Sequence, residues 1–436
     1  MHIDHEVMKK GFGGGFWKSS FLMTNKFVVL LVAIGMVMGF GGVLIPAGSY
    51  VATQLSEASG VPLFTVLSHG GRGGGGGSSA PTTYPGYIPI QIWQGYQYTS
   101  NGAYNPNYGT GETIAIIDAY GSPSISSDVS TFDSAFGLPA INLQIVHPFG
   151  KVSRNAGWAL ETSLDVEWAH AMAPAAKIVL IETPSASNTY LINDAVNYAL
   201  NTTHANVISM SWGEAESSLT SAELAQYHSI FSYVASQGVI EVGASGDNGA
   251  TDGTSSITVD YPSADPAVVA AGGTSLVLNN PTSSGASYGY EYAWNSSGGG
   301  ISTYFPEPAY QVNAGISATG RASPDVSYDA NPNTGVWVYD TTTYEGSTGW
   351  IQVGGTSAAA PQWSAIFADI QSIDGFSALN GGNVHTVLYS LYSSSNYDKA
   401  FHDETVGYNG YYYAGPGYDE VTGIGSPVVY ELISLA

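Results

Sequence analysis

The most reactive side chain that the sequence suggests is Ser357, in the segment Gly354–Pro361 (GGTSAAAP). Two glycines allow close backbone approach, and the small residues after Ser357 let a helix pack tightly against a sheet. Backbone N–H groups at the start of a helix can stabilise an oxyanion that forms beside a serine oxygen. Serine is also a favoured N-cap, so this position has an ordinary structural explanation as well.

A serine nucleophile needs a general base. None of the nine histidines lies in an H-G-T-H type of string, which would mark a subtilisin-type base. At about pH 3–4 an ordinary imidazole, with a pKa near 6.5, is protonated and cannot accept a proton. A carboxylate whose pKa lies near the working pH is the alternative base.

Glu161 and Asp165 can supply that carboxylate. Apolar residues at positions 160, 164 and 168 form one helical stripe, and the two acids lie four residues apart on a neighbouring face. Their Cβ atoms should be about 5–6 Å apart, so the two groups share a proton and their apparent pKa values separate. One can take the proton of Ser357 while the other orients it. An ordinary solvated acidic face is the alternative.

Asp247 follows a predicted strand in the segment Val242–Gly249 (VGASGDNG). A protonated Asp at this Gly-rich turn can donate a hydrogen bond to a developing oxyanion, which an ionised Asp cannot do. A turn-forming Asp beside Gly and Asn would show the same pattern.

Alternating strands and helices must position these residues. Continuous apolar runs favour buried parallel strands, and helical spacing lies between them, so we predict an α/β doubly wound domain with a mostly parallel sheet and helices on both faces. The expected strands are Thr113–Asp118, Ile178–Glu182, Asn206–Met210, Gly238–Val242 and Ala267–Ala271; the expected helices are Leu160–Met172, Tyr190–Leu200, Ser221–Ser236 and Thr356–Ile373. The C-terminal third is rich in Gly, Tyr and Ser and is expected to be mostly loop or short strand.

The composition excludes some functions and suggests an environment. Among 436 residues, 10 Lys and Arg stand against 34 Asp and Glu, a net charge of −24, so the chain is not expected to bind nucleic acid. There is no cysteine, which excludes disulfides and thiolate chemistry. Carboxylates with ordinary pKa values of about 3.9 and 4.3 are mostly neutral near pH 3–4, so a surface with few other charges suits an acidic medium.

The N-terminal part predicts export. We expect a basic cytosolic region at 1–26, a signal segment or transmembrane anchor at 27–45, a Gly/Ser-rich tether at 46–80 and one large folded domain at 81–436. The domain should therefore lie outside the cell, secreted or held at the surface. Signal peptide and membrane anchor remain open alternatives.

Taken together, these segments resemble the sedolisin family of serine-carboxyl peptidases, which have a subtilisin-like fold. The resemblance covers about residues 81–436. It rests on Glu161/Asp165 followed by Ala173–Lys177 (APAAK), and on Ser209–Gly213 (SMSWG), Ser245–Asp247 (SGD), Ser297–Gly300 (SGGG), Ser323–Val326 (SPDV) and Gly354–Pro361. It implies that Glu161 is the general base, Asp165 its partner, Asp247 the oxyanion donor and Ser357 the nucleophile, with Ser-Trp-Gly lining the cleft. Asp118 matches a position that is acidic in some members.

The resemblance also implies one structural Ca²⁺ ion. Its ligands would be the side chains of Asp403 and Asp419 and the backbone carbonyls of Glu404, Gly415 and Gly417. Carboxylates and carbonyls form the all-oxygen shell that calcium prefers. The glutamate at 404 departs from the family, in which this position is usually apolar.

The expected function is acid hydrolysis of peptide bonds in extracellular proteins or peptides by a monomeric enzyme. Endopeptidase and tripeptidyl-peptidase activity are both compatible with the sequence. Family members usually carry a folded pro-region, and residues 1–80 do not resemble one, so autocatalytic activation is in doubt. Two alternatives are a subtilisin-type triad of Asp118, His170 and Ser357, and an inactive, calcium-stabilised surface domain.

Overall fold

A central eight-stranded sheet organises the chain. The computed structural model describes residues 59–67, 81, 86–375 and 378–436. The strand order is β11-β10-β8-β6-β3-β5-β4, with β14 paired to β10. All neighbouring strands are parallel except the β10–β11 pair. The strands are β3 (Thr113–Ala119), β4 (Asn142–Val146), β5 (Lys177–Thr183), β6 (Val207–Met210), β8 (Ile240–Ala244), β10 (Val269–Thr282), β11 (Gly285–Ala293) and β14 (Val326–Asp329).

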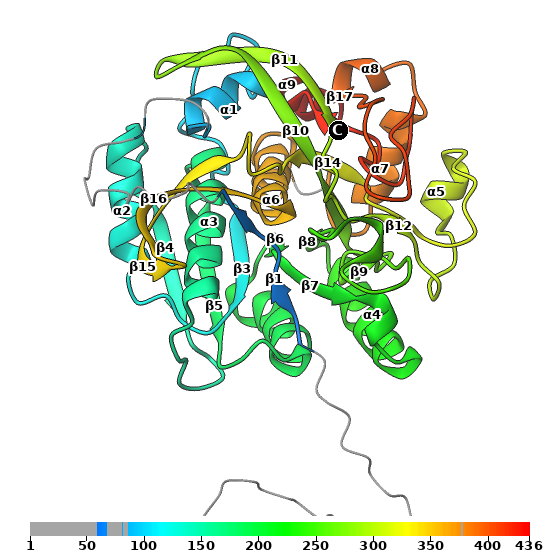
Figure 1. The fold of residues 1–436 in the computed structure, drawn as a ribbon, viewed down its shortest axis with the longest axis horizontal. Helices are drawn as coiled ribbons and strands as arrows, with labels where there is room; N and C mark the ends of the chain where they lie inside the picture. The colour runs from blue at the N-terminus through cyan, green and yellow to red at the C-terminus, as the bar shows by residue number, and fades with distance from the viewer. Residues whose placement is uncertain (1–58, 68–80, 82–85, 376–377) are drawn as a thin grey trace, which may run out of the picture. The chain divides into compact units, whose positions relative to one another are not determined.

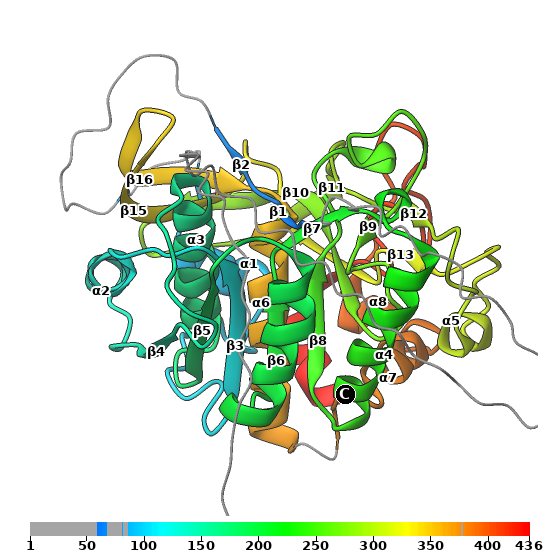
Figure 2. The ribbon, with the colours of Figure 1, turned by 90° about the horizontal axis from the view of Figure 1, so that it is seen from below.

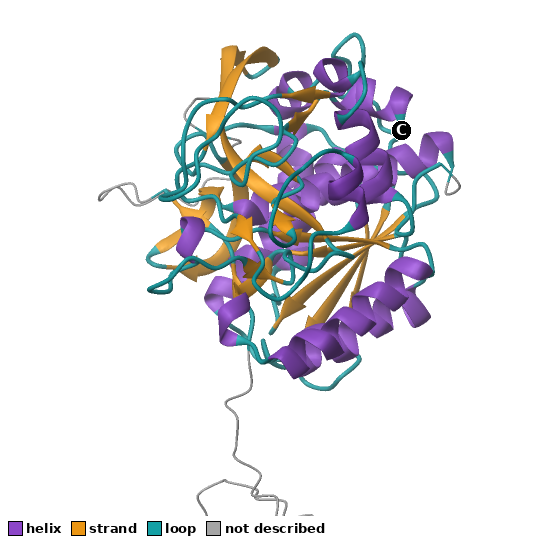
Figure 3. Cartoon of the chain, turned by 90° about the vertical axis from the view of Figure 1, so that its right-hand side faces the viewer, coloured by secondary structure: helices purple, strands orange, loops and turns teal. Residues whose placement is uncertain are grey.

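Helices cover both faces of this sheet, as Figure 3 shows. Along β3, Ile114 and Ile116 point into one apolar core, whereas Ala115 and Ile117 point into a second core on the opposite face. The first core includes α2 (Ile125–Phe136), α3 (Ala156–Met172) and α6 (Thr356–Asp374); the second includes η1 (Thr189–Val196), η2 (Ala199–Thr203) and α4 (Ser221–Ser236). Burial on both faces explains why the strands are continuously apolar in sequence.

The remaining elements are short or lie beside the main sheet. The strands are β1 (Val61–Pro62), β2 (Thr65–Val66), β7 (Trp212–Ala215), β9 (Asp260–Tyr261), β12 (Gly300–Ile301), β13 (Ala322–Ser323), β15 (Val336–Tyr344), β16 (Ser347–Gly354), β17 (Phe401–His402) and β18 (Ser426–Pro427). The helices are α1 (Pro89–Gly95), η3 (Glu216–Ser218), η4 (Gly249–Thr251), α5 (Ala309–Asn313), α7 (Val384–Tyr392), α8 (Tyr397–Ala400) and α9 (Val429–Leu435).

The predicted fold class is confirmed, and the predicted strands and helices recur with shifts of a few residues at their ends, except that the strand predicted at Ala267–Ala271 is β10, which continues to Thr282. The 190–200 segment forms two wider helical turns, η1 and η2, of the π type. The last third of the chain is more regular than expected, because it holds the long antiparallel β15–β16 hairpin and α7 in addition to the predicted α6.

The structure differs from the sequence prediction at the N-terminal border of the domain. Residues 59–67, assigned above to the tether, include β1, which pairs with β7, and β2, which pairs with β16 (Figure 2). The expected basic region 1–26 and apolar segment 27–45 lie outside the described residues. Within the described part, none of the helices has the length and apolar character needed to span a membrane.

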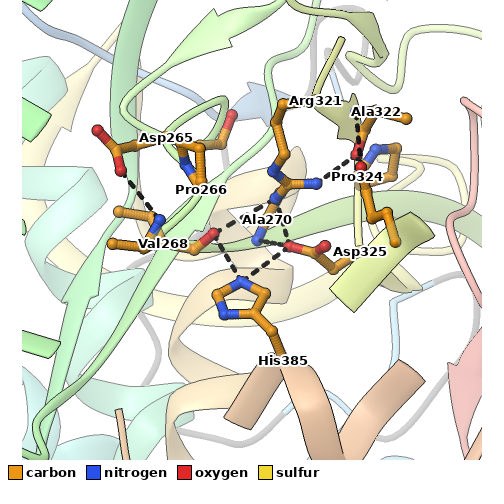
Figure 4. Close-up of polar contacts among 12 residues, drawn as sticks. Asp265, Pro266, Val268, Ala270, Arg321, Ala322, Pro324, Asp325 and His385 are labelled. Atoms are coloured by element: carbon orange, nitrogen blue, oxygen red, sulfur yellow. Dashed lines mark hydrogen bonds and ion pairs between the residues drawn. The ribbon is translucent and has the colours of Figure 1, made fainter. Parts of the chain in front are cut away.

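A buried ion pair lies where β10 and β14 begin, at the amino ends of these strands (Figure 4). The Arg321 guanidinium lies 2.6 Å from Asp325, and both side chains are fully buried. Asp325 also accepts from the Ala270 amide at 2.8 Å, and His385 lies 3.5 Å from it. Although burial alone would raise it, the pKa of Asp325 is held well below its usual range by Arg321 and His385. The SPDV motif is therefore a structural element that joins β13, β14 and α7.

Candidate active site

Ser357 begins α6 at the carboxyl end of the main sheet (Figure 1). The preceding Gly355 has φ +106°, and a Cβ atom there would lie 2.5 Å from an Asp247 carboxylate oxygen and 2.5 Å from the Leu63 carbonyl oxygen. Only glycine fits this turn. Ser357 itself is fully buried, and its hydroxyl donates to the Ser211 carbonyl at 3.1 Å.

Glu161 and Asp165 are fully buried on α3, which packs against α6. This burial excludes the solvated acidic face as an explanation. Ser211 links Asp165 to the serine, because its hydroxyl donates to Asp165 Oδ1 at 2.8 Å while its carbonyl accepts from Ser357. Within the described part of the chain, neither oxygen of Glu161 has a hydrogen-bond partner at ordinary distance, so both remain available to the Ser357 hydroxyl.

The electrostatics of this cluster favour shared protons. Burial first, and then the charges of Asp165 and Asp118, raise the pKa of Glu161 well above its usual range, while the nearby Ser357 hydroxyl acts to lower it. Burial and Asp118 likewise raise the pKa of Asp165, and burial raises the pKa of Asp118, at the end of β3, to about 7. Three carboxyl groups in one dry site cannot all be ionised, so they hold at least one proton between them.

Asp247 follows β8 and lies on the other side of Ser357. Its Oδ1 accepts from the Thr356 amide at 2.7 Å and from the Thr356 hydroxyl at 2.9 Å. Burial raises its pKa to about 7, although these bonds and a long one from Thr65 act in the opposite direction. Below neutral pH Asp247 is therefore protonated. With two donors directed at Oδ1, the proton resides on Oδ2, the oxygen that faces Leu63.

The backbone around this site is arranged to bind an extended chain. Ser211 precedes β7, and β7 pairs antiparallel with β1. The amide of Leu63 donates to the Ser211 carbonyl at 3.1 Å, and the carbonyl of Leu63 accepts from the Ser357 amide at 2.9 Å. The sequence placed the Ser-Trp-Gly segment in the cleft, but it gave no sign that Ser211 connects Asp165 to Ser357 or that Leu63 lies beside them.

The structure does not assemble the alternative triad. His170 is at the far end of α3, where its Nε2 lies 2.9 Å from the Pro139 carbonyl and 3.4 Å from Asp133. Burial lowers its pKa to about 4. Asp118 lies with the carboxyl groups instead, since its charge raises the pKa values of Glu161 and Asp165. The subtilisin-type reading of Asp118, His170 and Ser357 is therefore wrong.

The residues of the expected calcium loop come together at the C-terminal end. Asp403 accepts from the Gly417 amide at 3.0 Å, and Asp419 accepts from the Gly415 amide at 3.0 Å. The Glu404 side chain turns inward to Ser426 and Ser327, which leaves only its backbone for the loop. The part of the chain described here has no group of three or more acidic or histidine side chains positioned to hold a metal.

Comparison with known proteins identifies the family. A profile described as the subtilase family matches residues 153–390, more than half of the chain. Kumamolisin from Bacillus sp. (strain MN-32) is 33% identical over 383 residues, which cover 82% of this chain and 64% of the relative. The solved structure of Pseudomonas sedolisin (serine-carboxyl proteinase), complexed with two molecules of pseudo-iodotyrostatin, superposes with a TM-score of 0.71 at 28% identity, over 81% of this chain and 98% of that one. The chain belongs to the subtilase family, in its sedolisin branch.

Other sedolisins agree with this assignment. Sedolisin from Pseudomonas sp. (strain 101) is 30% identical over 72% of this chain and 56% of its own, and tripeptidyl-peptidase 1 from Rattus norvegicus is 28% identical over 69% and 56%. The chain described here thus spans between half and two thirds of the length of these curated relatives. The match agrees with a site built from Ser357 and buried carboxyl groups.

Proposed function

We propose that this sedolisin is an acid-acting serine peptidase that hydrolyses peptide bonds through an acyl-enzyme on Ser357. The observation that carries the proposal is the burial of Glu161 and Asp165 beside Ser357, with Ser211 joining them. A carboxyl cluster of this kind can accept a proton in a medium where imidazole is already charged. The names of the relatives support the same class of reaction.

Glu161 is the proposed general base. Glu161 must be ionised to act as a base, and neutral, protonated Asp118 and Asp165 beside it would favour that form. As Ser357 attacks a carbonyl carbon, its proton passes to Glu161. Asp165, held by the Ser211 hydroxyl at 2.8 Å, keeps Glu161 in position and shares the proton.

Asp247 and the Ser357 amide are the proposed oxyanion donors. The Ser357 amide already donates to a carbonyl oxygen, that of Leu63, at 2.9 Å. Protonated Oδ2 of Asp247 lies on the same side, since it and the Leu63 oxygen are each 2.5 Å from one point above Gly355. Two donors aimed at the developing charge stabilise the tetrahedral intermediate more than the planar substrate.

The proton then returns to the leaving amine from Glu161, and the bond between carbonyl carbon and nitrogen breaks. Water attacks the acyl-enzyme, with Glu161 again taking a proton, and Ser357 regains its hydroxyl. Activity should decline toward neutral pH, because Asp247 loses its proton as the pH rises through about 7.

A calcium ion and an acidic extracellular location belong to the same proposal. The proposed ligands of Ca²⁺ are Asp403 and Asp419 with the carbonyls of Glu404, Gly415 and Gly417. The ion would stiffen the loop 415–419, in which the Tyr418 amide donates to the Tyr392 hydroxyl. An ion bound only by the folded protein stabilises it by mass action. A chelator at about pH 5 should therefore lower the unfolding temperature, and added calcium, but not magnesium, should restore it.

Hydrolysis of an unstructured protein at about pH 4 tests the catalytic assignment. Ser357→Ala and Glu161→Gln should each abolish cleavage while keeping the circular dichroism spectrum and unfolding temperature of the parent. Asp374→Asn, which neutralises an exposed acid at the end of α6, is the matched control and should leave cleavage unchanged. Mapping the cuts by mass spectrometry decides between internal cleavage and release of N-terminal tripeptides. Full activity in either active-site variant would contradict the assigned roles.

A further inference from the structure

A short hairpin rich in tyrosine lies beside the candidate active site. The tyrosine hairpin (residues 406–414, VGYNGYYYA) contains no charged residue. Tyr408 and Tyr413 form its antiparallel bridge, and their rings stack with centroids 5.4 Å apart. The Asn409 amide donates to the Tyr412 carbonyl at 3.1 Å and closes the turn. The hairpin is thus held by its own backbone bonds.

Three rings of the tyrosine hairpin face the solvent. Tyr408, Tyr411 and Tyr413 are between 49% and 73% exposed. The Tyr412 ring instead packs inward, since a Cβ atom added at Gly300 would lie 2.9 Å from it. Single exposed apolar side chains are ordinary on protein surfaces, whereas a contiguous group of them marks an interaction surface.

The exposed rings continue onto the edge of the main sheet. The Val406 carbonyl accepts from the Ala293 amide at 2.9 Å, so the hairpin begins beside the end of β11. Tyr290 and Tyr292 of β11 are also exposed, and their rings lie 6.4 Å apart. At about 100 Å² for each exposed ring, five tyrosines offer roughly 500 Å², comparable with the largest apolar patch of a typical monomer. The tyrosine patch consists of Tyr290, Tyr292, Tyr408, Tyr411 and Tyr413.

The tyrosine hairpin packs against the loop that carries Asp247 (Figure 2). The Ala250 amide donates to the Asn409 carbonyl at 3.0 Å, and a Cβ atom at Gly249 would lie 2.3 Å from the same oxygen. Asp247, the proposed oxyanion donor, stands two residues before Gly249. The tyrosine patch is therefore continuous with a wall of the catalytic cleft.

This continuity favours one occupant of the patch, the polypeptide substrate itself. A chain held at Ser357 continues past the cleft, where an exposed aromatic surface adjoins the wall. Tyrosine rings carry no charge in an acidic medium, and they combine an apolar face with a hydroxyl group. They can therefore contact apolar side chains and backbone groups of an unfolded chain of almost any sequence. A folded protein keeps most of its apolar side chains inside and offers much less to contact.

We propose that the tyrosine patch is a second binding surface for unfolded polypeptide substrates, which holds the chain several residues away from the bond that Ser357 attacks. The inference rests on the proposed peptidase function and names its preferred substrates, long unfolded proteins. Binding at the patch raises the effective concentration of the neighbouring part of the same chain at Ser357. Long chains therefore gain in kcat/KM, and peptides too short to reach the patch do not.

The distance from the catalytic groups sets the length at which this gain begins. The three residues from Asp247 to Ala250 span at most about 11 Å, and one hydrogen bond joins Ala250 to the hairpin, so Tyr408 lies within roughly 20 Å of Asp247. An extended chain covers that distance with about six residues at about 3.3 Å each. Substrates with fewer residues beyond the cleaved bond should show no gain.

The test compares a quenched fluorescent peptide of about eight residues with the same peptide extended by about twelve uncharged residues rich in Leu and Phe, on its N-terminal or its C-terminal side. At about pH 4, one extended peptide should be hydrolysed with a kcat/KM about tenfold or more above that of the short peptide. An extension made of Gly and Ser should bring no gain. Equal kcat/KM values for the short peptide and both Leu/Phe-extended peptides would overturn the proposal and leave the peptidase function standing.

A triple variant, Tyr408→Ser with Tyr411→Ser and Tyr413→Ser, tests the patch itself. The ratio of kcat/KM between the long and the short peptide should fall by about tenfold, and this ratio does not depend on how much of a variant is folded. The matched control replaces two tyrosines exposed elsewhere, Tyr233 on α4 and Tyr430 on α9, by Ser and should keep the ratio. A triple variant that keeps the ratio would overturn the proposal.

Binding to the inactive Ser357→Ala protein gives a readout that needs no catalysis. By fluorescence anisotropy, the extended peptide should bind about tenfold more weakly once the three hairpin tyrosines are replaced. Tighter binding of a soluble glucan than of the peptide, or a dimer in sedimentation that the triple variant does not form, would assign the patch to a polysaccharide or to a second copy and overturn the proposal. If the wild type cleaves neither peptide, the peptidase function is refuted, and the substrate role of the patch with it.

Discussion

Removing the carboxyl group of Asp247 should reduce turnover without preventing folding. In the structure Oδ1 accepts from Thr356, and Oδ2, which has a long contact of 3.5 Å with the Thr65 hydroxyl, is the oxygen left to donate once Asp247 is protonated. Loss of one preorganised oxyanion donor typically lowers kcat by about 100- to 1000-fold, or roughly 3–4 kcal/mol. We therefore expect Asp247→Ala to lose this factor in kcat with little change in KM, since the donor acts mainly on the transition state.

Asp247→Asn gives the sharper test of the proton on this residue. The two Thr356 donors would hold the amide oxygen, so that the Asn nitrogen points where Oδ2 now lies and donates at every pH. Wild-type kcat should fall as the pH rises through about 7, the pKa of buried Asp247, whereas the Asn variant should lack this decline. The assay is hydrolysis of a quenched fluorescent peptide by wild type and variant across the pH range. An Ala variant within about threefold of wild type, or an Asn variant with the same high-pH midpoint, would refute the reasoning.

Three further predictions concern the structure around the site. Asp369 is fully buried, and burial raises its pKa well above the usual range. The folded state therefore keeps a proton that the unfolded state releases above about pH 4. The contribution of this group to the free energy of unfolding is complete below that pH and is lost as the pH rises, by up to about 4 kcal/mol at pH 7. Asp369→Asn should therefore raise the unfolding temperature at neutral pH much more than at pH 4, and an equal effect at both would contradict this. Gly355→Ala would place a Cβ 2.5 Å from Asp247 Oδ2 and 2.5 Å from the Leu63 carbonyl oxygen, so kcat/KM should fall by about 100-fold or more. Activity near wild type would show that the turn is not constrained. Arg321→Met removes the main counter-charge of buried Asp325, with His385 at 3.5 Å as the ion-pair partner that stays, and should cost about 3–5 kcal/mol in denaturant unfolding, with part restored when Asp325→Asn is added; an undiminished midpoint would show that the pair is not structural.

The sheet and its main helices could be predicted because their sequence signals are local. Strands buried on both faces, such as β3 and β5, each contain four consecutive apolar residues, and α4 begins at a capping box where Thr220 and Glu223 bond each other's backbone. β4 was missed because it pairs only with β5 and is partly exposed along its length. The β15–β16 hairpin was missed because its polar and aromatic residues look like a loop until they pair with each other.

The residue types of the site could be predicted from the sequence, but their burial and packing could not. The four-residue spacing of Glu161 and Asp165 places them on one helical face, but only packing against α6 decides that the face is dry and that the pKa values rise. Ser211 acts through its backbone carbonyl and its hydroxyl at once, and neither role has a sequence signature. β1 and β2 have two residues each, too few for any periodicity, and they form only because β7 and β16 offer unpaired edges. Their residues therefore read as part of a linker.

The central claim, that a carboxyl cluster activates Ser357, is tested most directly by trapping its covalent product. Enzyme crystallised at about pH 4 with a peptide aldehyde should show a hemiacetal bond from Ser357 Oγ to the aldehyde carbon. The hemiacetal oxygen should lie within hydrogen-bond distance of both the Ser357 amide and Asp247 Oδ2, with Glu161 in contact with Ser357 Oγ. Glu161→Gln should form no adduct under the same conditions. An aldehyde bound without a bond to Ser357, or an adduct that forms equally in Glu161→Gln, would contradict the account.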